Sequence, residues 1–334
     1  MSQVVHASLE TPALELFAAV GIVADRRATP PSLELFAEQS DRALARTRAQ
    51  VEAGDMPRDK AAAFQQLIVD ACAHVMCHPV IAGNRYLERF AQGVSLAQAR
   101  HELQQFSVFA LQFDVAQAKL VANAPTWESY KERLKVLLNE KGIPYTDGFD
   151  GDLTGKWSPA TVHFHWLMNT AKGLGLGFED LGKIWIGQGG TQQFVKCTFD
   201  TYASTDRNTA LGASFAIENW AANGLWTPWI AGMKKLNATL DRPVDLGYLT
   251  YHEAQEEHHS QATIDELYET FLLPEFDHDT FFAGADRILN DGVQAYYESQ
   301  LATLPEKDAT WPESATRTRM FDPADLPRLE LAAV

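Results

Sequence analysis

The segment 251–259 places two histidines and a carboxylate at the spacing of one helical face. No glycine or proline occurs at 248–273, so we predict one continuous helix there. A helix makes a turn about every 3.6 residues, so His252, Glu256 and His259, at i, i+4 and i+7, stack on one side of it. Burying these groups is costly without a partner, and a divalent metal ion is the commonest partner. The alternative interpretation is a solvated acidic face with incidental histidines.

Two other metal motifs fit this segment less well. A zinc-peptidase motif beginning at His252 needs a second histidine four residues later, where the chain has Glu256. Glu256-x-x-His259 matches a ferritin-type di-metal signature, whose second copy would be Glu275-x-x-His278. That copy lies only a short way down the chain, and its acidic residues are better explained as favourable charges at a helix N-terminus.

The three cysteines, Cys72, Cys77 and Cys197, predict no disulfide framework and indicate a reducing compartment. The pair at Cys72 and Cys77 has four residues between its members, whereas covalent haem attachment needs two. Because free cysteine behaves as a small hydrophobic residue, we interpret these cysteines as structural and buried.

Composition sets the broad class of the protein. The chain has 334 residues, 46% of them hydrophobic and 22% charged, as in ordinary soluble globular proteins. Its net charge of −16 disfavours a nucleic-acid partner, which requires a basic surface. We find no signal peptide and no apolar run long enough to span a membrane, so we expect a cytoplasmic protein without a membrane partner.

Helical spacing of apolar residues recurs along most of the chain, while strand patterns are few, so we predict an all-α fold. A loop at 142–159, rich in glycine, proline and aspartate, is longer than most connections and of the kind that is often functional. Besides the helix at 247–273, we predict helices at 14–24, 32–53, 59–75, 79–90, 95–120, 127–140, 160–173, 178–186, 207–222, 227–237 and 279–303.

Further candidate ligands lie on other predicted helices. Glu218 lies within the apolar run 213–220, where a carboxylate is costly unless it is paired or ligating. Glu140 ends a predicted helix and by itself would pass for a surface residue. His163 and His165 begin the helix at 160–173; they lie two residues apart and point in different directions, so only one of them can ligate.

In this order, the candidate ligands resemble those of the haem-oxygenase-like di-iron oxidases, relatives of the TenA and PqqC proteins. That family has a glutamate, a histidine, a glutamate on a later helix, and then His-x3-Asp/Glu-x2-His. The resemblance covers roughly residues 70–300. The residues that match the pattern are Glu140, His163, Glu218, His252, Glu256 and His259. His163 is preferred to His165 because of its distance from the Leu174-Gly175 pair.

The resemblance implies a haem-oxygenase-like bundle of about seven core helices at 71–305, with a helical extension at 1–70 and an irregular tail at 306–334. It implies two iron ions bound by the six residues, with O2 as co-substrate, and a donor set without thiolate suits iron or manganese better than structural zinc. The expected activity is oxygenation or oxidation of a small amine or amino-acid-like metabolite, with a preference for N-oxygenation in a biosynthetic pathway. Oxidative C–C cleavage or decarboxylation, and a metal-free TenA/PqqC-like enzyme, are the alternatives. A homodimer and an electron donor are further expectations.

Two features depart from the family pattern. Position 256 is glutamate where aspartate is usual, and the loop at 142–159 is longer. Related amine N-oxygenases tend to carry an extra carboxylate near the first ligand pair. Asp152 is the first candidate, followed by Asp150 and Asp147, and turn-forming aspartate beside glycine is the alternative interpretation. Aromatic residues that could line a pocket are Phe106, Phe109, Phe113, Trp166 and Trp220, and the alternative is that most of them are core residues.

Overall fold

A computed structural model describes residues 4–23, 31–146 and 152–331, without the side chains of residues 31, 256–259 and 331. The regular structure of the described chain is mainly helical, with one pair of short strands, which confirms the all-α prediction. Its α-helices are α1 (Ala13–Ala19), α2 (Pro31–Ala53), α3 (Arg58–Ala71), α4 (Pro79–Ala82), α5 (Arg85–Phe90), α6 (Leu96–Ala122), α7 (Trp127–Glu140), α8 (His163–Gly173), α9 (Gly189–Asp200), α10 (Arg207–Trp220), α11 (Trp226–Asn237), α12 (Gly247–Phe271), α13 (His278–Arg287) and α14 (Ala295–Thr303).

Local sequence explains where several of these helices begin. Ser95 accepts a hydrogen bond from the Gln98 backbone N–H, and the Gln98 side chain accepts one from the Ser95 N–H, which forms a complete capping box before α6. Thr126 caps α7 by accepting from the Ser129 N–H. Asp277 caps α13 in the same way, which confirms its interpretation as a helix N-terminal residue, whereas Glu275 lies before the helix.

Short π-helical segments join three pairs of helices. They occupy Cys72–Met76 between α3 and α4, Ala221–Leu225 between α10 and α11, and Ile288–Gln294 between α13 and α14. Such segments are rare and frequently occur near functional sites. The middle one borders the cavity described below.

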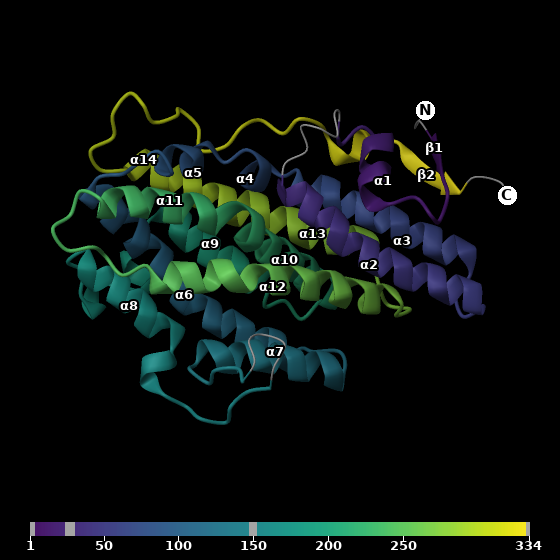
Figure 1. Ribbon diagram of the computed structural model, residues 1–334, viewed down its shortest axis with the longest axis horizontal. Helices are drawn as coiled ribbons and strands as arrows, with labels where there is room; N and C mark the ends of the chain where they lie inside the picture. The colour runs from purple at the N-terminus through teal and green to yellow at the C-terminus, as the bar shows by residue number, and fades with distance from the viewer. Residues whose placement is uncertain (1–3, 24–30, 147–151, 332–334) are drawn as a thin grey trace.

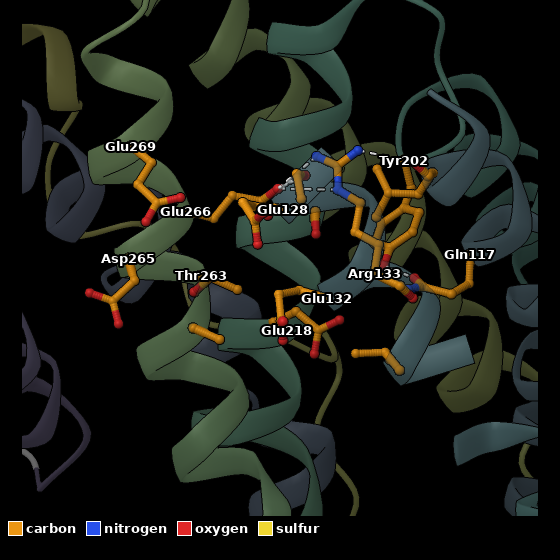
Figure 2. Close-up of a pocket in the computed structure, with 15 residues that line it drawn as sticks. Gln117, Glu128, Glu132, Arg133, Tyr202, Glu218, Thr263, Asp265, Glu266 and Glu269 are labelled. Atoms are coloured by element: carbon orange, nitrogen blue, oxygen red, sulfur yellow. Dashed lines mark hydrogen bonds and ion pairs between the residues drawn. The ribbon is translucent and has the colours of Figure 1, made fainter. Parts of the chain in front are cut away.

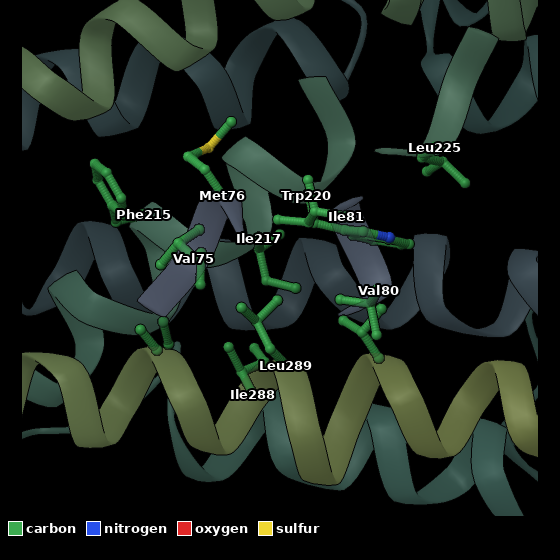
Figure 3. Close-up of a cluster of buried hydrophobic side chains, with 14 of the residues drawn as sticks. Val75, Met76, Val80, Ile81, Phe215, Ile217, Trp220, Leu225, Ile288 and Leu289 are labelled. Carbon is green, nitrogen blue, oxygen red and sulfur yellow. The ribbon is translucent and has the colours of Figure 1, made fainter. Parts of the chain in front are cut away.

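Helices α10 and α13 pack closely at the centre of the molecule, because glycine brings their backbones together. A Cβ atom on Gly212 would lie 1.8 Å from the Phe281 carbonyl oxygen, and one on Gly284 would lie 2.4 Å from that of Thr209. Apolar side chains from the three π-helical segments, among them Met76, Leu225, Ile288 and Leu289, belong to the same buried cluster as Trp220 at the end of α10 (Figure 3).

The hydrophobic core runs through both predicted domain boundaries. One cluster of buried side chains extends from Ala7 to Ala315, so the N-terminal helices and part of the tail share the core of the bundle.

The cysteines at 72, 77 and 197 are free and buried, which agrees with their interpretation as structural residues.

The tail predicted to be irregular contains a strand, which corrects the sequence analysis. β2 (Arg328–Leu331) pairs in parallel with β1 (Val4–Ala7), so the two ends of the chain lie side by side (Figure 1). Asp70 of α3 anchors this pair, because its carboxylate lies 3.1 Å from the Arg328 Nη1 atom and 2.8 Å from the His278 Nε2 atom. Four-residue strands separated by almost the whole chain give no recognisable pattern in the sequence.

The prediction of a helix at 178–186 is wrong. Two 3₁₀ turns, Phe178–Asp180 and Ile184–Ile186, replace it, and Gly182 between them has φ 71°, which a helix does not allow. The next helix, α9, was not predicted, since it begins at a Gly-Gly pair with low helix propensity. Among the described residues we find no helix with the length and apolar character needed to cross a membrane.

Candidate metal centre

Three of the predicted ligands converge at one edge of the bundle, where α7 and α8 lie beside α12 (Figure 1). Glu140 is the last residue of α7, His163 is the first residue of α8, and His252 lies near the start of α12. One ligand atom from each lies within 4.8 Å of the other two. The segment between α7 and α8 therefore connects two ligand residues, Glu140 and His163, that lie close together.

His252 is held in the form that can bind a metal. Its Nδ1 atom lies 2.7 Å from the Tyr248 carbonyl oxygen, one turn earlier on α12, and a carbonyl can only accept a hydrogen bond. Nδ1 therefore carries the proton, which leaves the Nε2 lone pair free. Nε2 faces the Glu140 Oε1 atom at 3.7 Å, and the side chain is largely buried.

His163 provides the test of whether a metal fits this site. The residue is 2% exposed, and neither of its ring nitrogens has a hydrogen-bond partner among the described residues. Its Nδ1 atom lies 2.9 Å from the Glu140 Oε1 atom, at ion-pair distance. A buried imidazole without a hydrogen-bond partner is costly. The ligand atoms of His163, His252 and Glu140 converge on one point, which is the arrangement that a cation requires. These residues fit a metal ion.

Glu140 supplies the negative charge of the group. Burial raises the pKa of this carboxyl, but its interactions with the neighbouring His163 and His252 side chains lower it by more, so its pKa lies well below the ordinary value. Glu140 is therefore ionised at neutral pH and available as a ligand.

Aromatic rings fix both histidines. Trp166 stacks on His163 with ring centroids 4.6 Å apart, and its indole N–H donates to the Ala160 carbonyl at 2.7 Å. Trp226 stacks on His252 at 5.1 Å, and Tyr251 meets His163 edge-on at 4.9 Å. The rings limit rotation of the imidazoles and keep water away from the metal-binding atoms.

A cavity of about 80 Å³ adjoins the group, and Glu140, His252 and Glu218 all line it. Glu218 is thus on the same cavity, although it is not among the three residues with converging ligand atoms. The side chains of Glu256 and His259 lie outside the described residues, while their backbone belongs to α12. Predicted aromatic residues Phe106, Phe109, Phe113 and Trp220 also line this cavity.

The structure separates the two histidines at the start of α8. His163 is buried in the group, whereas His165 is exposed and outside it. Among the candidate extra carboxylates, Asp152 is exposed, and its carbonyl accepts a hydrogen bond from the Thr146 N–H at 2.9 Å. Asp147 and Asp150 lie outside the described residues.

Sequence reasoning missed another carboxylate, that of Asp114 on α6. Its side chain is mostly buried, it pairs with Lys141, and the pKa of its carboxyl is raised, chiefly by burial. The charges of Glu140 and His163 also act on this pKa, so Asp114 lies close to the candidate metal centre. Nothing in the sequence around an aspartate on a long helix indicates that it lies beside a metal centre.

Comparisons with known proteins add little to this geometry. No family model matches the chain, and no curated protein matches it. A crystal structure of a TenA homolog from Pseudomonas syringae pv. tomato is similar to it, with 15% sequence identity, over 72% of this chain and 92% of that chain, at a TM-score of 0.46. The assignment of the site rests on its own residues.

Proposed function

We propose that this protein is a non-haem di-iron oxygenase or oxidase that uses O2 to oxidise a small amine. The observation that carries the proposal is the Glu140–His163–His252 group, in which both histidines are buried, the ligand atoms lie within 4.8 Å of one another, and His163 has no hydrogen-bond partner among the described residues. One carboxylate and two neutral imidazoles suit iron, and no thiolate competes. Glu218, Glu256 and His259 complete the proposed ligand set for a second ion.

The protein's own residues would prepare this site in three ways. The Tyr248 carbonyl holds the proton on His252 Nδ1 and so directs Nε2 toward the ion. Trp166 and Trp226 orient the two imidazoles and exclude water. Bound iron would supply the activation of O2, which amino-acid side chains alone do not provide.

Shape also supports a small co-substrate next to the ligand group. The adjoining cavity, at about 80 Å³, can hold a few small molecules but not a metabolite of ordinary size. Its walls are mainly aromatic and aliphatic, which favours a nonpolar gas over water. The organic substrate would enter through a larger space, considered in the next subsection. Oxidative C–C cleavage or decarboxylation remains the alternative outcome of the same chemistry.

One observation favours a second candidate, a metal-free TenA/PqqC-like enzyme. The 2.9 Å approach of His163 to Glu140 would also suit a carboxylate and imidazole that exchange a proton with a substrate. This candidate predicts catalysis in the presence of chelator, whereas the di-iron proposal predicts none.

Metal analysis of purified variants tests the proposal. The full chain should bind close to two iron ions, and His163→Ala and His252→Ala should each lose at least one. His165→Ala is the matched control, since it removes an exposed imidazole from the same helix, and it should retain the iron. Iron-dependent O2 consumption with a panel of amines should likewise be reduced in His163→Ala and His252→Ala and retained in His165→Ala. Wild-type iron content in both ligand variants would refute the assignment.

A further inference from the structure

A cavity of about 490 Å³ lies between α7 and α12, next to the candidate metal centre (Figure 2). Its size falls within the range of small-molecule sites. Two residues, Val136 and Glu218, line both this cavity and the smaller one that contains Glu140 and His252. We call it the α7–α12 pocket. Its described lining residues are Gln117, Leu120, Glu128, Ser129, Glu132, Arg133, Val136, Tyr202, Ser214, Glu218, Ala262, Thr263, Asp265, Glu266 and Glu269.

The pocket follows the helix that supplies a candidate metal ligand. Val136 lies one helical turn before Glu140 on α7, and Glu128 lies two turns further out. At a rise of about 1.5 Å per residue, the wall from Glu128 to Val136 is about 12 Å long. An elongated molecule in the pocket would therefore have one end beside Glu218, at the metal centre, and the other near the protein surface.

The apolar lining residues place few chemical requirements on a ligand. Leu120, Val136 and Ala262 are apolar. The buried polar groups already have partners, because the Tyr202 hydroxyl donates to Gln117 and the Thr263 hydroxyl donates to the Ser260 carbonyl at 2.8 Å. Such walls suit an aliphatic segment without polar groups.

Arg133 is the single cation among the described lining residues, and its guanidinium is already engaged. Its Nε and Nη2 atoms donate to Glu266 Oε1 at 3.1 and 2.7 Å, and Nη1 donates to the Leu120 carbonyl at 2.9 Å. Figure 2 shows the dashed lines that join Arg133 on α7 to Glu266 on α12. With its side chain only 11% exposed, Arg133 is a structural bridge and offers no open receptor for an anion.

Carboxylates surround the outer part of the pocket. Glu128 and Glu132 extend from α7, and Asp265 and Glu269 extend from α12 on the opposite side. Their cationic partners do not line the pocket, and these exposed pairs are each worth only about 0–1 kcal/mol, so a bound cation can compete with them. The pairs are Glu128–Lys131, Glu132–Lys135, Asp265–Arg46 and Glu269–Arg46.

From these features we infer that the α7–α12 pocket binds a linear aliphatic amine with two or more positive charges and no carboxylate. One ammonium group lies among the outer carboxylates, the aliphatic segment lies along Val136 and Ala262, and the other nitrogen lies at the end of the pocket that adjoins the candidate metal centre. A substrate carboxylate would meet like charges among the outer carboxylates, and none of the described lining residues offers it an open cationic side chain. The inference deepens the proposed function by naming its substrate class, and it argues against decarboxylation of an acid.

Calorimetric titration with matched ligands tests the inference on the full chain, both as purified and after chelator treatment. Cadaverine and lysine differ only by a carboxylate, as do agmatine and arginine. We expect each decarboxylated amine to bind about tenfold or more tightly than its amino acid, since like charges repel the carboxylate. Pentane-1,5-diol, which has the length of cadaverine without its charges, should not bind. Equal or tighter binding of the amino acids would overturn the inference, as would a lack of binding by diamines of three to six carbons and spermidine.

Charge variants locate the binding. Glu132→Gln and Glu128→Gln alter exposed residues, so both should fold, and each should weaken cadaverine binding several-fold. Glu88→Gln is the control, because Glu88 is an exposed carboxylate that pairs with Arg317 outside the pocket. Unchanged affinity in both pocket variants would refute the assignment. Binding measured after chelator treatment does not depend on iron, so amine binding and the di-iron proposal can fail separately.

Discussion

The Lys141 ammonium contacts the Asp114 carboxylate, and this ion pair ties the end of α7 to α6 directly after Glu140. Glu140 therefore reaches the candidate metal centre from a backbone position that a neighbouring helix restrains. The pair is partly buried on the Asp114 side, so it is less screened by solvent than an exposed pair.

We expect Asp114→Asn to weaken metal binding by about tenfold, because residues that orient a ligand typically affect affinity to that extent. Competition against a chelator would measure the affinity. The melting temperature of the metal-free protein should fall only slightly, which distinguishes a positioning role from a general structural one. Glu38→Gln, which removes an exposed ion pair with Arg42 far along the chain, should leave the affinity unchanged. An unaltered affinity in Asp114→Asn would show that Glu140 does not need this restraint.

Metal addition should stabilise the protein through the Glu140–His163–His252 group. A ligand that binds only the folded state at a hundred times its Kd adds about 2.7 kcal/mol to the free energy of unfolding. We therefore expect Fe(II), added without oxygen, to raise the melting temperature by a few degrees in the wild type and in His165→Ala. The rise should be reduced or lost in His163→Ala. A comparable rise in that variant would indicate that the metal binds elsewhere.

Glu102 predicts a pH dependence of stability unrelated to the metal centre. It is fully buried among Tyr86, Tyr296 and Gln300, and burial raises the pKa of its carboxyl from 4.5 to about 7, although hydrogen bonds from these three residues oppose the shift. Between these pH values the folded protein holds the proton and the unfolded chain does not. The free energy of unfolding therefore falls as pH rises through this window, by roughly 3 kcal/mol in all. Denaturant titrations at several pH values should show this loss, and Glu102→Gln should reduce it. An equal slope in wild type and variant would contradict the prediction.

Gly212→Ala should destabilise the fold, because the new methyl group would collide with the Phe281 carbonyl and force α10 away from α13. We expect a loss of about 1–3 kcal/mol or more, as for other overpacked cores. Urea denaturation would measure it. Gly189→Ala is the matched control, since a Cβ atom there meets no neighbour within 4 Å. Equal stability of the two variants would mean that the close contact of α10 and α13 can relax at little cost.

The sequence predicts features that depend on neighbouring residues better than features that depend on residues far apart in the chain. Helical periodicity and local caps such as Ser95 are short-range features, and the sequence identifies them well. Glycine-rich local structure is harder, as the missed helix α9 and the wrongly predicted helix at 178–186 illustrate. The strand pair at the chain ends depends on contacts across almost the entire sequence, and no local pattern encodes it.

In the candidate metal centre, too, some residues can be recognised from the sequence and others only from the structure. The order of Glu140, His163 and His252 along the chain was informative, and the structure brings these three together. Asp114 could not be recognised, because only tertiary packing places it beside Lys141. The Tyr248 carbonyl that orients His252 is a backbone atom, for which residue identity gives no signal.

The parallel pairing of β1 with β2 has a consequence for the order of folding. During synthesis, Val4–Ala7 emerges first, but its partner Arg328–Leu331 emerges after nearly all of the helices. The bundle can thus assemble while the first strand still lacks its hydrogen bonds. Closing so long a loop is entropically costly unless the intervening chain is already compact. We therefore expect the strand pair, with its Asp70 anchor, to form only after the helices between the two strands have packed.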